Sequence, residues 1–79
     1  MTNEEILHNF FDMMNKMNIP YIHVQYENVI DIPNTSYKIE FNETTRPWKC
    51  WLLKDGKEVY SGHPTSTLIM LRYRLATGK

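Results

Sequence analysis

The dipeptide Asp55-Gly56 lies between two strand-like runs, Trp48 to Leu53 and Glu58 to Ser61. A two-residue type I′ turn needs positive φ at both central positions, so this pattern predicts a β-hairpin. Counting outward from the turn gives the pairs Lys54 with Lys57, Leu53 with Glu58, Leu52 with Val59 and Trp51 with Tyr60. Successive side chains alternate between the two faces of a strand. One face then carries Trp48, Cys50, Leu52 and Val59, and the other carries Lys49, Trp51, Leu53, Glu58 and Tyr60.

Helical patterns lie on either side of this hairpin. Thr2 followed by Glu5 is typical of a helix N-terminus, and the apolar residues from Ile6 to Met17 recur at helical spacing up to about Asn18. A second helix is expected to begin at Pro64 and to end at Gly78. The hydroxyls of Thr65, Ser66 and Thr67 are expected to accept hydrogen bonds from its free amides.

Two further segments alternate apolar and polar residues as half-buried strands do, namely 21–27 and 37–42. The segment 28–35 between them contains Pro33 and Asn34, so we expect it to be a partly buried connection. The order predicts one α+β domain over residues 1–79. It would be a two-layer sandwich of a helix, three or four antiparallel strands and a helix, with both helices on one sheet face.

Size and composition restrict the function. A chain of 79 residues forms one compact domain with no room for a large enzyme cleft. No apolar run is longer than four residues, whereas a membrane helix needs about 20. The lone Cys50 cannot form an internal disulfide, and no export signal is recognisable, so we expect a cytoplasmic protein without membrane association.

The net charge is zero, but the two halves of the sequence differ in sign. Residues 1–40 carry six acids and two bases, and residues 41–79 carry three acids and seven bases. The two halves can interleave and attract each other within the fold. If they stay apart, the surface is dipolar and favours self-association or an electrostatic partner.

No pattern of catalytic or metal-binding residues is recognisable. The histidines, the cysteine and the acids do not occur at zinc-site spacing, and His8 with Asp12 fits a solvated helix face. Asp55, Ser61 and His63 lie close in sequence, but no nucleophile motif accompanies them. The sequence therefore predicts a non-enzymatic protein without metal or cofactor.

The sheet face that points away from the helices is the main candidate binding site. If Ile22, Val24 and Tyr26 point inward with the other apolar strand residues, aromatic side chains stand among charges on the opposite face. Such anchors in a polar surround are typical of recognition surfaces, although Trp51 with Tyr60 could also be a purely stabilising cross-strand pair. The expected protein-binding residues are Tyr21, His23, Gln25, Lys38, Lys49, Trp51, Leu53 and Tyr60.

A second candidate site lies at the start of the second helix. Residues 62–67 connect a strand to a helix, where exposed amides and the helix dipole can hold a phosphate. Ordinary capping explains the same residues. As a ligand site it would bind a phosphorylated nucleotide with Lys57, Thr65, Ser66, Thr67, Arg72 and Arg74.

Two resemblances suggest partners. The segment from Trp51 through Tyr60 to Leu75 resembles the end of small phage α-β-α sandwich domains, in which a tryptophan-bearing hairpin leads into a threonine-led helix. This implies a phage or prophage accessory protein that inhibits a host protein, such as a defence complex, in the host cytoplasm. We also expect the chain to form a homo-oligomer. The order of elements also resembles double-stranded-RNA-binding domains, which implies duplex RNA as an alternative partner. Because that family's lysine-rich helix start is replaced by 64–67 and the net charge is zero, duplex RNA ranks below the other two alternatives.

Overall fold

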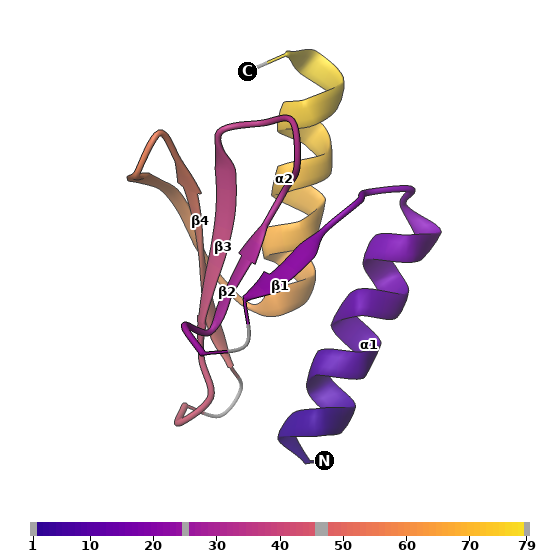
Figure 1. Cartoon of the computed structure of the whole chain (residues 1–79), viewed down its shortest axis with the longest axis vertical. Helices are drawn as coiled ribbons and strands as arrows, with labels where there is room; N and C mark the ends of the chain where they lie inside the picture. The colour runs from indigo at the N-terminus through magenta and orange to yellow at the C-terminus, as the bar shows by residue number, and fades with distance from the viewer. Residues whose placement is uncertain (1, 25, 46–47, 79) are drawn as a thin grey trace.

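The computed structural model describes residues 2–24, 26–45 and 48–78, and it contains two helices and a five-stranded antiparallel sheet (Figure 1). The α+β class is confirmed, but the sheet has five strands where three or four were predicted. The strands are adjacent in the sheet in the order of the sequence. The elements are α1 (Asn3–Lys16), β1 (Ile22–Val24), β2 (Val29–Asp31), β3 (Tyr37–Asn42), β4 (Lys49–Lys54), β5 (Lys57–Gly62) and α2 (Pro64–Thr77).

Both helices begin and end close to the predicted positions. The Thr2 hydroxyl accepts a hydrogen bond from the Glu5 amide at 3.2 Å, and α1 is followed by Asn18 in a left-handed conformation at φ 59°. At α2 the capping is different from that predicted. The imidazole of His63 accepts from the Thr65 amide at 3.2 Å, and the hydroxyls of Ser66 and Thr67 donate to the His63 carbonyl. These hydroxyls therefore act as donors and not as acceptors.

The segment predicted to be a connection contains the additional strand, β2. Val29 and Ile30 of this strand are buried. The preceding strand β1 stops at Val24, because the chain turns there: the Glu27 amide donates to the Val24 carbonyl at 3.2 Å, and Asn28 takes a left-handed φ of 51°. The strand predicted for residues 21–27 is therefore too long, because its last residues belong to a turn.

The β4–β5 hairpin has the predicted turn but a different register beyond its first two pairs. Asp55 and Gly56 have φ of 53° and 78°, as a type I′ turn requires. Lys54 pairs with Lys57 and Leu53 with Glu58, as predicted. The register then shifts, so that Leu52 pairs with Tyr60 and Trp51 with Ser61. A bulge accommodates one extra residue, Val59, on β5. The β5 side chains after Val59 therefore lie on the opposite face from the one predicted by counting pairs outward from the turn.

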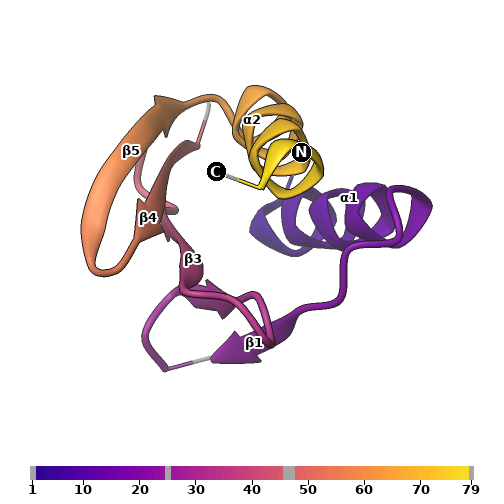
Figure 2. The same ribbon diagram turned by 90° about the horizontal axis from the view of Figure 1, so that it is seen from above.

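One core cluster joins both helices to the sheet. Figure 2 shows the sheet curving around the side on which α1 and α2 lie next to each other. Trp48 is 2 % exposed, as predicted, and its ring stacks on Phe41 at 5.0 Å while its indole N–H donates to the Asn3 side-chain oxygen at 3.3 Å. The buried members of the cluster are Phe10, Met14, Ile19, Ile30, Ile32, Tyr37, Ile39, Phe41, Trp48, Cys50, Leu52, Leu68 and Leu71.

Among the residues described, neither α1 nor α2 has the length and apolar character needed to cross a membrane.

Candidate functional site

The strand pairing defines the sheet face opposite the core, which we call the outer sheet face. On β3 and β4 its residues alternate with the buried Ile39, Phe41, Cys50 and Leu52. The pairing extends the face over all five strands in rows that run across the sheet. One row consists of Ile22, Asp31, Lys38, Leu53 and Glu58, the next of Val24, Val29, Glu40, Trp51 and Ser61, and a short third row of Asn42 and Lys49.

Trp51 lies near the middle of β4 on this face. Its neighbours in the strand, Cys50 and Leu52, are 1 % and 0 % exposed and point into the core, so the indole points away from it. The ring is half-buried and does not belong to the hydrophobic side chains that pack on the core. The Lys49 ammonium lies 5.3 Å from the ring centroid, close enough for a cation–π contact, and Glu40 faces Trp51 across the strand pair.

Aliphatic residues extend this apolar area across the sheet. Leu53 is half-buried, Val24 is half-buried, and Ile22 is 56 % exposed. Val29 is only 7 % exposed although it lies outside the core cluster. Val24 and Glu40 are its register neighbours on the outer sheet face. The face is thus partly packed and carries an exposed apolar margin at Ile22.

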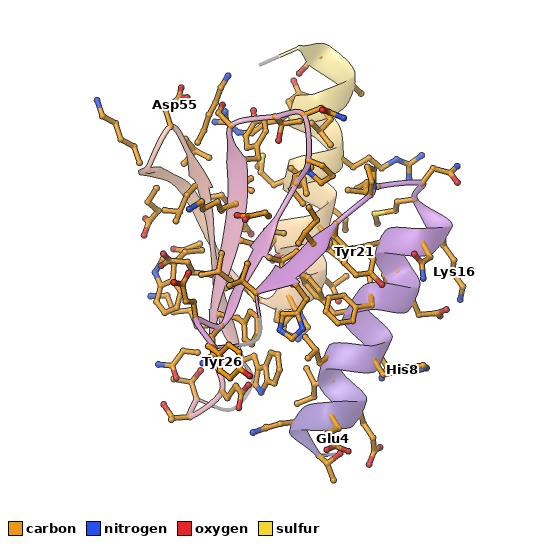
Figure 3. All side chains as sticks on the ribbon, viewed as in Figure 1. Glu4, His8, Lys16, Tyr21, Tyr26 and Asp55 are labelled. Atoms are coloured by element: carbon orange, nitrogen blue, oxygen red, sulfur yellow. The ribbon has the colours of Figure 1, made fainter. Side chains whose placement is uncertain are left out.

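The face assignment of the first strand was wrong. Tyr21 and His23 were expected on the outer sheet face, but both lie on the helix side. Tyr21 points toward α1 (Figure 3) and stacks on Phe11 at 4.5 Å. The His23 ring lies 5.3 Å from the Phe11 ring. Ile22 was expected inside and is exposed. The phase of β1 is set by the pairing of His23 with the fully buried Ile30.

Tyr26 misled the sequence interpretation. It was counted with Ile22 and Val24 as an inward residue, but it belongs to the turn after β1 and is 100 % exposed (Figure 3). Gln25, which was also predicted to bind a protein, lies outside the residues that the structure describes. β1 is too short for the alternation of apolar and polar residues to show which of its side chains face the core. Only the neighbouring strand, which was not predicted, could have corrected it.

Tyr60 was also placed on the wrong face. Because of the bulge it pairs with Leu52, and it packs against the core. Ser61 takes the predicted place of Tyr60 opposite Trp51. Of the eight predicted protein-binding residues, the structure therefore keeps four together on the outer sheet face, namely Lys38, Lys49, Trp51 and Leu53.

The residues of the predicted nucleotide site are not brought together. Lys57 begins β5 at the hairpin turn, while Thr65 follows the other end of that strand. At about 1.5 Å per residue, Arg74 lies about 13 Å along the helix from Thr65. Thr67 is fully buried and its hydroxyl is engaged by the His63 carbonyl. Only Thr65 of this set lines the neighbouring hollow of about 430 Å³, which otherwise consists of Ile6, Asn9, Phe10, Met13, Trp48, His63 and Pro64.

Groups that could perform chemistry are dispersed. Within residues 2–24, 26–45 and 48–78, no three metal-ligating side chains form a cluster. Asp55 lies in the turn before β5, at the opposite end of that strand from Ser61 and His63, so the three do not come together as a hydrolytic set would require. Burial raises the pKa of the Cys50 thiol to about 12, which keeps it protonated at neutral pH. Comparison of the chain with protein-family models, curated proteins and solved structures gave no match.

Proposed function

We propose that this chain is a non-enzymatic binding module that recognises a folded protein through its outer sheet face, with Trp51 as the central anchor. The observation that supports this proposal is the position of Trp51: a half-buried indole that points away from the core, beside Lys49 and opposite Glu40. Tryptophan is enriched among the residues that dominate binding energy, because it covers a large area at low cost in side-chain entropy.

The charges on this face favour a protein over a nucleic acid. Lys38 lies in one row with Asp31 and Glu58, and Glu40 lies in the neighbouring row, next to the row that contains Lys49, so the face carries charges of both signs. A phosphate backbone would require a clearly basic surface. Apolar and aromatic residues with charges of both signs around them are typical of protein interfaces.

In this proposal α1 and α2 both cover the inner sheet face, so no element of the described chain covers the outer one. The resemblance of the hairpin and second helix to small phage α-β-α sandwich domains makes a host protein the proposed partner, inhibited because its surface is blocked. The neutral charge fits such occlusion better than imitation of a nucleic acid, which needs an acidic surface.

Capture of a partner from host lysate, followed by titration calorimetry with the purified partner, tests this proposal. Trp51→Ala is expected to weaken binding by about 30-fold, equivalent to about 2 kcal/mol. Tyr73→Ala is the matched control, because it removes an exposed aromatic ring from α2 and should leave the affinity unchanged. If a folded Trp51→Ala variant binds as tightly as the wild-type chain, the outer sheet face is not the binding surface.

A further inference from the structure

Asp31 carries a carboxylate that the fold leaves without a partner. This residue ends β2, and its Oδ1 atom is sealed from water although it accepts no hydrogen bond. Within the residues that the structure describes, no ion pair involves it either. Buried polar atoms are nearly always hydrogen-bonded, and an anionic oxygen is especially costly to bury without a donor. A donor group from another molecule would satisfy this carboxylate.

The register partner of Asp31 across the β2–β3 pair is Lys38. Both side chains point to the outer sheet face, because their neighbours Ile30 and Ile39 are fully buried on the other face. In the described part of the chain no ion pair joins Lys38 to Asp31, and Lys38 is exposed. An exposed lysine keeps its hydration and gains little from a surface ion pair. Lys38 is therefore a competitor for the carboxylate and not its fixed partner.

A hollow of about 360 Å³ lies beside Asp31. Its lining combines three kinds of group. Asp31 supplies a carboxylate, and Asn34 and Ser36 supply neutral oxygens on exposed side chains. Ile22, which is 56 % exposed, and Pro33 supply apolar surface. An arginine side chain matches this combination, because its guanidinium carries a charge and several N–H donors at the end of an apolar stem.

A metal ion matches the hollow less well. Calcium takes about six to eight oxygen ligands, typically with more than one carboxylate among them. Among the residues that the structure describes, no three acidic, histidine or cysteine side chains come together anywhere. A lysine from another molecule would bring the charge but not the planar fork that pairs with both oxygens of a carboxylate. The lining therefore favours a guanidinium.

We propose that Asp31 receives an arginine side chain of the protein that covers the outer sheet face. The guanidinium donates to the Asp31 carboxylate, and the arginine stem lies against Ile22. The terminal torsion of an aspartate is soft, so a rotation of the carboxylate presents both of its oxygens to the two parallel N–H groups. Since the arginine belongs to the partner of that face, the inference rests on the proposed function and names a group that the partner presents.

The position of Asp31 allows one partner to contact it together with Trp51. Asp31 lies two strands away from β4 and in the row of Leu53, two residues along from the row of Trp51. These steps amount to about 10 Å across the sheet and about 7 Å along it. A protein interface of ordinary size, about 800 Å² on each partner, covers both positions.

Amide-resolved NMR of the purified chain, titrated with the capped tripeptide acetyl-Gly-Arg-Gly-amide, tests the proposal without the partner. Saturable shifts are expected at residues 31–38, and the matching lysine tripeptide should bind at least about threefold more weakly. The citrulline tripeptide, which has the same shape without the charge, should cause no shift. Lys38→Met removes the competing cation and should strengthen binding of the arginine tripeptide by about two- to threefold.

Two carboxylate variants locate the binding site. Asp31→Asn should abolish the shifts, because the amide keeps the shape of the side chain but not its charge. Glu58→Gln is the matched control: it removes a carboxylate from the same row, outside the hollow, and should leave the titration unchanged. Absence of saturable shifts in the wild-type chain, or equal binding to Asp31→Asn, would overturn the proposal. Shifts of the same amides by calcium chloride and not by the arginine tripeptide would overturn it in favour of a metal site.

Urea denaturation of the free chain tests whether Lys38 already satisfies the carboxylate. Asp31→Asn should unfold at a urea concentration no lower than that of the wild type, because it removes an unpaired charge. Losses in both Asp31→Asn and Lys38→Met that fail to add in the double variant would show an internal ion pair and contradict the proposal. These measurements need no partner, whereas the proposed function depends on partner binding by Trp51→Ala, so failure of either one is distinguishable from failure of the other.

Discussion

Tyr60 pairs with Leu52 across the β4–β5 hairpin, so both side chains lie on the helix side of the sheet. The bulge at Val59 causes this arrangement, and Gly62 leaves room for the Tyr60 ring. A methyl group added at Gly62 would lie 3.2 Å from the Tyr60 hydroxyl and 3.5 Å from the Ser66 hydroxyl. Tyr60 thus fills the space between the end of β5 and the start of α2, and its ring belongs to the core and not to the binding surface.

Tyr60→Ala is therefore expected to destabilise the fold, by about 1 to 3 kcal/mol in the free energy of unfolding, because it removes a ring that packs on the core. Urea denaturation measures the effect. Trp51→Ala, at the residue next to Leu52 on β4 and on the other face of the sheet, serves as the control and should cost less. Equal losses in the two variants would contradict the assignment of faces.

The reversed phase of β1 predicts opposite results for two adjacent residues. His23→Thr should lower the stability by about 0.5 to 3 kcal/mol, because it removes the ring contacts with Phe11 and Phe41. Ile22→Thr keeps a β-branched residue at an exposed position and should change the stability by no more than about 0.5 kcal/mol. Thermal or urea unfolding of both variants decides the matter. If Ile22→Thr were the more damaging change, β1 would have the phase that the sequence suggested.

Trp48→Ala should cost about 3 to 5 kcal/mol, as expected for a large side chain removed from a core. It deletes both the stack on Phe41 and the hydrogen bond to Asn3. Trp48→Phe keeps an aromatic ring beside Phe41 but loses the N–H donor, so it should be clearly less harmful. Chemical denaturation of the two variants measures the difference, and equal stability losses would show that the stacked ring contributes little.

Burial of Cys50 makes the stability dependent on alkaline pH. The pKa of this thiol rises from 9.0 to about 12 in the folded chain, so between these values the folded state binds more protons than the unfolded state. The free energy of unfolding should then fall as pH rises through this range, by up to about 1.4 kcal/mol per pH unit from this group. Cys50→Ala lacks the titrating group. From pH 9 to 12 the free energy of unfolding of the wild type should therefore fall more than that of the variant. A constant difference would mean that the thiol titrates as it does when unfolded.

The sequence predicted the elements whose determinants are local. The cap at Thr2, the stop at Gly78 and the type I′ turn at Asp55-Gly56 depend on residues within a few positions, and all three are present. The burial of Trp48 was also predicted correctly, because it follows from the alternation along one long strand.

Features that depend on pairing with another strand could not be predicted in the same way. β2 has only three residues and lies in a segment with Pro33 and Asn34, which concealed it. Without β2 the phase of β1 was read from Ile22 and Val24 alone, and Tyr21 and His23 were assigned to the wrong face. Nothing in the hairpin sequence indicates the bulge at Val59. Either Val59 or Tyr60 could pair with Leu52, because both side chains suit a half-buried strand position.

Acrylamide quenching of two single-tryptophan variants tests the central claim most directly. Trp48→Phe leaves Trp51 as the only indole, and Trp51→Phe leaves Trp48. The open position of Trp51 on the outer sheet face predicts red-shifted emission and efficient quenching in the first variant, and blue-shifted, weakly quenched emission in the second. A Trp51 as protected from acrylamide as Trp48 would contradict the claim that this indole is available to a partner.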